Sequence, residues 1–399
     1  MKIQQGTRMF RNTSLALFAG GFSTFALLYS LQPLMPELSE TFAITPTQAS
    51  LSLSVTTISM ALTMLLIGSL SDAWGRKSIM TASLVTASVI AILTAVMPSF
   101  VLLLILRVLQ GVALAGLPAI AMTYLVEEIE PASLGYAMGL YISGNSIGGM
   151  AGRMISGLLT DIWGWRYAVS TIGLLGVASA LIFWMVIPSS RHFVSRTSRL
   201  SGVVPLLWSQ LRNPRLLCLY GLGFLLMGSF VTLFNYIGFK LTAAPYNLSQ
   251  SLVGSIFVVY LMGTFSSTWM GRLADRYGRS RVLVLGLALL LLGALLTLND
   301  SLWVTIIGLA VFAFGFFGSH SIASSWVGLA ADTHLSQANA LYLFFYYIGS
   351  SVSGTGGGML FSSLGWHGVV GMIAGYVIIS LLLCYILTVS SKSNEPKNR

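Results

Sequence analysis

The sequence predicts an all-α membrane protein that crosses the bilayer twelve times, as two related bundles of six helices. Hydrophobic residues make up 55% of the 399 residues, charged residues only 8%, and the mean hydropathy is +0.84. So few charges cannot cover the surface of a water-soluble domain of this length. Twelve long apolar runs follow one another along the chain, and one short charged motif occurs in each half.

The apolar runs are separated by charged or Pro/Gly-rich breaks, and each suits a spanning helix of about 20 residues. The first six are expected near residues 13–35, 47–70, 79–97, 99–124, 134–160 and 166–187. The others are expected near 216–240, 249–272, 282–299, 302–326, 337–362 and 366–389. We therefore expect an N-terminal bundle over 1–187, a cytoplasmic linker over 188–215, a C-terminal bundle over 216–389 and a cytoplasmic tail over 390–399.

The basic residues predict the orientation. With the N-terminus in the cytoplasm, the cytoplasmic segments hold 17 of the 21 Lys and Arg residues, and the external loops hold only Arg166 and Lys240. This distribution follows the positive-inside rule and places both termini in the cytoplasm. The net charge of +10 is therefore interpreted as topology, and no nucleic-acid partner is expected.

A charged turn motif, G-x-L-x-D-x-x-G-R, lies between two apolar runs in each half, at an offset of 203 residues. Glycines near the end of a run let another helix approach, and glycines at the turn allow a tight reversal. The aspartates can face the N-terminal end of a neighbouring helix. We expect Asp72 to face the eleventh span near Ser336 and Gln337, and Asp275 to face the fifth near Ser133. The motif residues are Gly68, Asp72, Gly75 and Arg76, and then Gly271, Asp275, Gly278 and Arg279.

This repeated motif resembles the signature loop of the major facilitator superfamily. A second internal match, at an offset of 201 residues, relates Leu140-Tyr141 … Gly148 … Gly164-Trp165 to Leu341-Tyr342 … Gly349 … Gly365-Trp366. The resemblance implies the major facilitator fold and alternating access to a site near the membrane midplane.

Acidic residues at the cytoplasmic ends of the fourth and tenth spans are the expected partners of the motif arginines. We expect Arg76 to pair with Glu127 or Glu128, and Arg279 to pair with Asp332. Such pairs would hold the cytoplasmic face closed when the protein opens outward.

Two arginines fall inside predicted spans, where a charge costs at least about 2.5 kcal/mol unless it faces a cavity or a partner. Arg107-Val-Leu-Gln110-Gly111 resembles the fourth-helix motif of proton-coupled facilitators, which implies that Arg107 responds to substrate or to protonation. The alternative is an arginine that binds backbone carbonyls for packing alone. Arg153 is the second buried cation.

The fifth span carries Gly144, Gly148 and Gly152 at a spacing of four, which predicts a close helix–helix face. The same stretch resembles the antiporter motif of drug exporters, with Gly149 in place of the proline. Packing and a role in the direction of transport therefore both remain open. Asn145 is expected on the same face as Arg153, near the rim of the cavity.

Polar residues inside other spans are expected to face one central cavity, because exposure to lipid is costly. His320 is the histidine placed mid-span and could carry a proton or serve only as a structural donor. Aromatic residues from Tyr342 to Tyr347 could wall a pocket or form a packed surface. The residues expected to line the cavity are Tyr29, Gln32, Arg107, Asn235, Tyr236 and His320.

Several kinds of chemistry are missing from the sequence. All eleven acidic residues lie at span ends or in loops, which favours neutral or anionic solutes over cations. There is no HExxH, P-loop or GxSxG motif, so we expect neither an enzyme nor an ATP-driven pump. No metal site is expected, and Cys218 and Cys384 are expected to be buried hydrophobes.

The stretches Leu140–Arg153 and Gly228–Gly238 resemble the YnfM-type, or acriflavine-sensitivity, branch of bacterial proton-coupled exporters. The resemblance implies a monomer in the bacterial inner membrane that exports a small organic solute or drug. Its partners would be the solute, protons and membrane lipids, with the proton gradient in place of a cofactor. The alternatives are a proton-coupled importer of a small organic anion, which Arg107 and Arg153 favour, and a transport-dead membrane sensor.

Overall fold

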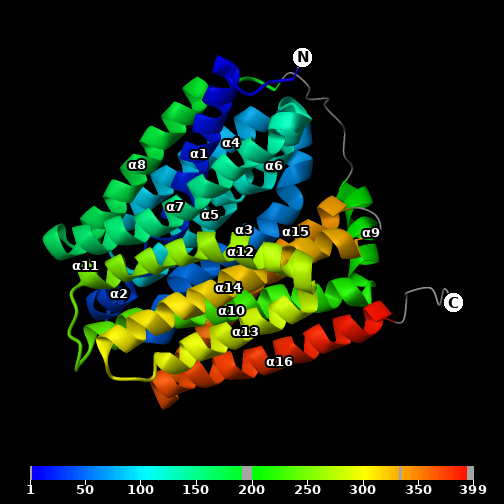
Figure 1. The fold of residues 1–399 in the computed structure, drawn as a ribbon. Coiled ribbons are helices and arrows are strands. Elements are labelled where there is room, and N and C mark those ends of the chain that lie inside the picture. The colour runs from blue at the N-terminus through cyan, green and yellow to red at the C-terminus, as the bar shows by residue number, and fades with distance from the viewer. Residues whose placement is uncertain (1, 191–199, 332–334, 393–399) are drawn as a thin grey trace. The chain divides into compact units, whose positions relative to one another are not determined.

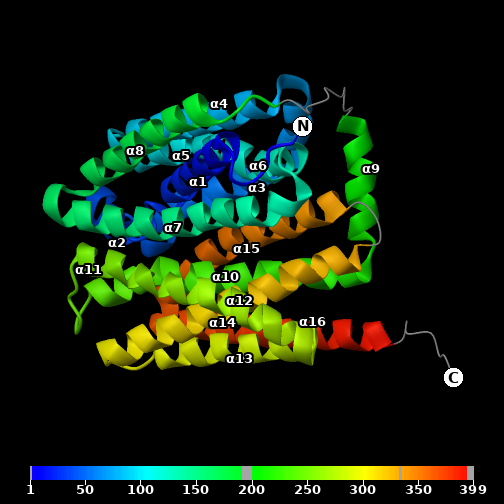
Figure 2. The same cartoon turned by 45° about the horizontal axis from the view of Figure 1, so that its top comes forward.

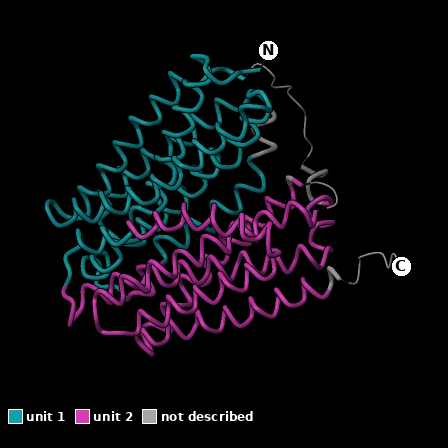
Figure 3. The backbone as a smooth tube through the Cα atoms, in the orientation of Figure 1, with its two compact units in different colours: residues 1–45, 51–200, 248–257 teal, residues 46–50, 201–247, 258–399 magenta. Residues whose placement is uncertain are grey.

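The computed structural model describes residues 2–190, 200–331 and 335–392, without the side chains of 68–73, 200–204, 336 and 390–392. All elements within these residues are helices (Figure 1). The chain divides into two compact units (Figure 3). Unit 1 comprises residues 1–45, 51–200 and 248–257, and unit 2 comprises residues 46–50, 201–247 and 258–399. Each unit thus includes one short segment from the other half of the sequence.

The helices of the first half, in chain order, are α1 (Arg8–Tyr29), α2 (Met35–Phe42), α3 (Pro46–Trp74), α4 (Arg76–Ala95), α5 (Phe100–Leu114), α6 (Gly116–Glu128), α7 (Pro131–Trp163) and α8 (Trp165–Val186). Those that follow are α9 (Leu200–Leu211), α10 (Pro214–Thr242), α11 (Gln250–Ser255), the 3₁₀ helix η1 (Ile256–Tyr260), α12 (Leu261–Tyr277), α13 (Arg279–Leu296), α14 (Leu302–Ala330), α15 (Leu335–Leu364) and α16 (Trp366–Lys392).

Each predicted span corresponds to a helix or to a run of joined helices, which confirms the predicted fold class. Within the described residues, nine helical stretches are long and apolar enough to cross a membrane. Two of them are composite, since α5 and α6 together form Phe100–Glu128 and α11 to α12 form Gln250–Tyr277. The other three spans, α1, α7 and α15, are 22, 33 and 30 residues long. Outside the spans, α9 lies within the predicted linker.

The second glycine of each motif reverses the chain as predicted, but the close approach of a helix expected at Gly271 is absent, because a methyl group there would meet no atom within 4 Å. Gly75 has φ of +89° between α3 and α4, and Gly278 has φ of +90° between α12 and α13. This backbone conformation favours glycine because a side chain would clash with its own backbone. The two turns therefore have the same geometry in both halves of the chain.

The glycine face of α7 packs against α1, which lies beside α7 and α8 (Figure 2). A methyl group on Gly144, Gly148 or Gly152 would overlap the α1 backbone at Phe18, Phe22 or Ala26 respectively. The close helix–helix face that the glycine spacing predicts is therefore present between α7 and α1. In unit 2, Gly349 of α15 approaches the backbone of Phe224 in α10 in the same way.

The N-terminal segment, residues 2–6, is bound to the connection between α6 and α7 in unit 1. Ile3 forms an isolated parallel β-bridge with Ile129, with its N–H donating to Glu128 O at 2.8 Å and its carbonyl accepting from Glu130 N at 3.0 Å. The Ile3 side chain is buried beside Tyr124, in one apolar cluster. The segment is thus part of the packed structure as well as a carrier of positive charge.

Candidate functional site

The motif loop of the first half contains an ion pair. Arg76 Nη2 lies 2.8 Å from Glu127 Oε1, and Arg76 Nε donates to Glu127 Oε2 at 3.2 Å. The Arg76 and Glu127 side chains are only 9% and 24% exposed, so this bidentate ion pair is poorly screened by water. The predicted partnership of Arg76 with the end of the fourth span is therefore present, through Glu127.

The motif loop of the second half differs. Arg279 Nη2 lies 3.7 Å from Asp275 Oδ1 within the same loop, and the two side chains are 36% and 77% exposed. Asp332, the expected partner of Arg279, lies outside the described residues, as do the side chains of Asp72 and Ser336. The expected contact between Asp275 and Ser133 would join the two units and stays a prediction. In unit 1, the Ser133 hydroxyl accepts from Gln5 N at 3.2 Å.

Arg107 is buried in α5 and binds carbonyl oxygens. Its Nε donates to Ser52 O at 2.8 Å, and its Nη2 donates to Leu28 O at 2.9 Å. Its Nη1 donates to Gln110 Oε1 at 2.6 Å, and Gln110 in turn donates to Ala87 O. This arrangement matches the packing alternative, because the guanidinium ties α5 to the neighbouring backbones of α1 and α3.

Arg153 of α7 lies at the centre of an arginine cluster, formed in unit 1 by Tyr29, Gln32, Gly149, Arg153 and Phe257. Its Nε donates to Gln32 Oε1 at 2.7 Å, and its Nη1 donates to Gly149 O. The guanidinium carbon stands 4.0 Å above the centre of the Tyr29 ring and 5.0 Å from that of Phe257. The side chain is 2% exposed. Stacking and hydrogen bonding together hold the planar guanidinium in one orientation.

Asn145 lies two turns before Arg153 on α7 and faces α1 as well. Its side-chain oxygen occupies the space that a methyl group on Gly21 would take, so no larger residue fits there. Asn145 and Arg153 therefore share one face of α7, although they contact different turns of α1, Asn145 at Gly21 and Arg153 at Tyr29.

Asn235 and Tyr236, the predicted residues of α10, are buried in unit 2. The Tyr236 hydroxyl donates to Gly354 O, and Thr232 Oγ1 donates to Ser353 O at 2.9 Å. Asn235 is fully buried between them along the helix. Tyr236 and Thr232 thus join α10 to α15 through hydrogen bonds to backbone carbonyls.

His320 of α14 belongs to an aromatic cluster in unit 2. Its Nδ1 lies 2.9 Å from the Tyr342 hydroxyl, and its ring stacks on Phe316 at 5.9 Å and meets Tyr346 at 4.7 Å. Phe316 continues the cluster to Phe230, with ring centres 4.0 Å apart. The aromatic cluster comprises Phe230, Phe234, Tyr260, Phe312, Phe316, Phe317, His320, Tyr342 and Tyr346.

Comparison with known proteins now decides the family. The model of the Major Facilitator Superfamily matches residues 17–245 and again residues 235–399, one match for each half of the chain. This chain belongs to the Major Facilitator Superfamily.

Two bacterial relatives extend over nearly the whole facilitator chain. The "Uncharacterized MFS-type transporter YybF" of Bacillus subtilis is 51% identical over 396 residues, which are 99% of this chain and 98% of that protein. The inner membrane transport protein YnfM of Escherichia coli is 47% identical over 381 residues, which are 96% of this chain and 91% of that protein. The facilitator is therefore a multi-pass membrane transporter.

A solved structure agrees on the fold. A bacterial homolog of the human lysosomal transporter Spinster, in an inward-facing and unoccupied conformation, matches with a TM-score of 0.79 and 16% identity. The match covers 99% of this facilitator and all of that chain. At this identity the likeness concerns the fold alone.

The structure assembles only part of the predicted cavity of the facilitator. Unit 1 brings Tyr29, Gln32 and Arg153 together, and unit 2 brings His320 and Tyr342 together. A single cavity would involve both units and stays a prediction. Sequence reasoning missed Phe257 and most of the aromatic cluster. Phenylalanines four residues apart, as at 230 and 234 or 312 and 316, are a sequence signal for one shared helix face.

Proposed function

We propose that this facilitator is a proton-coupled exporter of a small organic solute that carries negative charge or hydrogen-bond acceptors. The observation that supports this proposal most is the arginine cluster. A cation at this depth in a span costs at least about 2.5 kcal/mol, so a purely structural role would need a large compensating gain. Arg153 instead has an arrangement that suits a planar anion, because its guanidinium is oriented by Tyr29 and Gln32.

The solute class follows from the charges of the spans. The eleven acidic residues lie at span ends or in loops, whereas Arg107 and Arg153 lie inside spans. Arg107 donates to three backbone carbonyls and to Gln110, so Arg153 is the better candidate for solute contact. A cationic drug would meet repulsion at such a site, and a carboxylate would be attracted to it.

The aromatic cluster favours a solute with a ring. Four members are partly exposed and offer faces on which a planar group can stack: Tyr260, Phe317, His320 and Tyr346. His320 is our candidate for the proton carrier, because an imidazole is the side chain that most readily exchanges a proton near neutral pH. Its hydrogen bond to Tyr342 would link that exchange to α15.

A proton-coupled importer of a small organic anion is the second candidate. The arginine cluster supports it equally, because a binding site of this charge does not fix the direction of transport. The glycine face of α7 gives no preference either, since its described role is packing against α1.

The test uses proteoliposomes with an acidic lumen and a panel of aromatic carboxylates and lipophilic cations. An antiporter will accumulate an added carboxylate while protons leave, which a lumenal pH dye reports. An importer that couples the anion to protons will accumulate the carboxylate only when the gradient is reversed. Accumulation of the cations alone would contradict the proposed solute class.

The role of Arg153 is tested by Arg153→Gln and Arg153→Lys in the same vesicles. Because Gln removes a charged hydrogen-bond donor, we expect carboxylate transport to fall about 10- to 100-fold. Lys retains the charge without the planar geometry and should lose less. Unchanged transport in Arg153→Gln would show that the cluster serves packing.

A further inference from the structure

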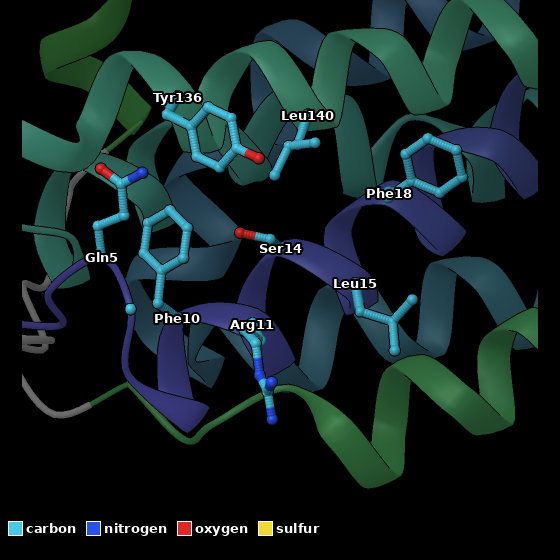
Figure 4. Close-up of a pocket in the computed structure, with 9 residues that line it drawn as sticks. Gln5, Phe10, Arg11, Ser14, Leu15, Phe18, Tyr136 and Leu140 are labelled. Atoms are coloured by element: carbon cyan, nitrogen blue, oxygen red, sulfur yellow. The ribbon is translucent and has the colours of Figure 1, made fainter.

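A groove lies between the N-terminal part of α1 and the start of α7, within unit 1 (Figure 4). Its volume is about 470 Å³. The lining residues are Gln5, Gly6, Phe10, Arg11, Ser14, Leu15, Phe18, Tyr136 and Leu140. None of them belongs to the arginine cluster or to the motif loops, so the groove is separate from the sites described above.

The walls of the groove are mainly apolar and partly accessible. Phe10 and Tyr136 stack across it with ring centres 5.9 Å apart, and they join α1 to α7. Leu15 is 54% exposed and Tyr136 is 56% exposed, although both are large side chains. In a membrane protein, accessible apolar walls of this kind suit a hydrocarbon chain.

The polar side chains of the groove can all donate hydrogen bonds. Ser14 is 7% exposed, and its buried hydroxyl makes no hydrogen bond in the structure. Figure 4 shows this hydroxyl pointing toward the Phe10 ring, below Tyr136 and away from Leu15; all four residues line the groove. Arg11 lies about one turn closer to the N-terminus, and no acidic side chain is among the nine lining residues. A buried hydroxyl without a partner is costly, so a ligand with an acceptor would be favoured here.

The spacing of these donors matches an amphiphile. Arg11 and Ser14 are three residues apart on one helix, which corresponds to about 4.5 Å along its axis. A phospholipid has an anionic phosphate, ester carbonyls a few bonds deeper, and then its acyl chains. Because α1 is the first membrane span, its N-terminal end lies where lipid headgroups meet hydrocarbon.

We propose that this groove binds one anionic phospholipid. Its phosphate is held by Arg11, an ester carbonyl accepts from Ser14, and an acyl chain lies against Phe10, Phe18 and Leu140. The lipid would link α1 to α7 on a surface that neither the solute nor the proton needs to reach.

The test measures lipid binding to the delipidated, detergent-solubilised full chain by native mass spectrometry. The probes are phosphatidylglycerol and phosphatidylcholine with identical acyl chains. We expect one phosphatidylglycerol per chain, bound about fivefold more tightly than phosphatidylcholine, because one arginine contributes a preference of that order. Arg11→Gln should abolish this preference, and Ser14→Ala should weaken binding of both lipids about two- to tenfold.

Arg8→Gln is the matched control, because it removes the same charge from the start of α1 but Arg8 does not line the groove. It should bind both lipids as the unmodified chain does. Equal binding of the two lipids by the unmodified chain would overturn the proposal, as would equal losses in Arg8→Gln and Arg11→Gln. Competition by a transported carboxylate would also overturn it and would assign the groove to the solute. Since binding is measured without transport, failure of the exporter proposal would leave this result intact.

Discussion

The α1–α7 pair of unit 1 and the α10–α15 pair of unit 2 share a scaffold and differ in chemistry. Gly148 meets Phe22 in the first pair as Gly349 meets Phe224 in the second, so α1 and α10 are related by an offset of 202 residues and α7 and α15 by 201. By these offsets, Gly354 corresponds to Arg153. The counterparts of Tyr29 and Gln32 are Val231 and Phe234.

This difference shows which part of the repeat is tied to folding. Close approach of two helix backbones requires glycine in both units, whereas Tyr29 and Gln32, which contact Arg153 in unit 1, correspond to apolar residues in unit 2. There, the corresponding region holds Phe234 and the aromatic cluster. We infer that unit 1 provides the charge recognition and unit 2 the ring recognition of the proposed transporter.

The largest expected effect tests the shared scaffold. Gly148→Val and Gly349→Val should each destabilise the protein by about 3 kcal/mol, because the new side chain would overlap a neighbouring backbone. Thermal unfolding of the purified protein measures the loss. Gly139→Val, also in α7, is the control, since a methyl group at this position meets no atom within 4 Å. Equal losses in all three variants would remove the packing explanation.

A smaller effect is expected at the motif loops. Arg76→Ala should lower the free energy of unfolding by about 2 kcal/mol, because it leaves the partly buried Glu127 carboxylate without its bidentate donor. Arg279→Ala should cost less than about 0.5 kcal/mol, since its contact with Asp275 is long and exposed to solvent. Chemical denaturation of both variants measures the difference in their free energies of unfolding. Glu127→Gln serves as a second variant of the Arg76–Glu127 pair. Similar losses for both arginines would mean that the loops are equivalent.

The aromatic cluster is tested by His320→Phe. The substitution keeps the ring stacked on Phe316 and removes the hydrogen bond to Tyr342. If unit 2 contributes mainly ring recognition, KM for an aromatic carboxylate should rise only about two- to fivefold. If His320 carries the proton, accumulation against a gradient should disappear and the pH dependence should flatten. His320→Gln, which removes the ring, separates the two effects.

The smallest effect concerns Asp161, just beyond the fifth predicted span, whose carboxylate accepts from the N–H groups of Gln250 and Ser251 at 2.9 and 2.8 Å. Its counterpart is Ser362, whose hydroxyl lies 3.5 Å from that of Thr47. Partial burial raises the pKa of Asp161, but the hydrogen bonds from Ser251, Ser249 and Gln250 together lower it below its usual value.

Asp161→Asn should therefore cost about 0.5 kcal/mol at neutral pH, and Ser362→Ala less. Because the folded-state pKa is lowered, the contribution of the carboxylate is present above the unfolded value of about 3.9 and is lost as the pH falls through the folded value. The thermal unfolding midpoints of the unmodified protein and of Asp161→Asn should therefore converge as the pH falls below about 4 and through the folded-state pKa. A difference that persists at low pH would show that charge is not its cause.

Much of the fold could be predicted because its causes are local in the sequence. Apolar runs mark the spans, and the glycines at 75 and 278 mark reversals that few other residues allow. The pairing of Arg76 with Glu127 followed from the repeat, since a helix that ends beside the loop must bring its terminal acids there.

The remaining features depend on contacts between distant segments. Phe257 reaches Arg153 because residues 248–257 pack within unit 1, which no periodicity reveals.

The break between α5 and α6 did have a signal in the sequence, because Pro118 cannot donate to the carbonyl of Leu114. The prediction of one uninterrupted span over 99–124 overlooked it. The Ile3 bridge had no signal, since a single isoleucine in a polar segment carries no pattern.

That bridge sets an order on biosynthesis. Ile3 is synthesised more than a hundred residues before the backbone groups that it binds, at Glu128 and Glu130. At about 5–20 residues per second, the segment waits roughly 6 to 25 s for its partner while several spans are being inserted. Its binding therefore comes late, after α6 and the start of α7 have emerged, and a bulky fusion at the N-terminus would interfere with assembly at this stage more than with insertion of α1.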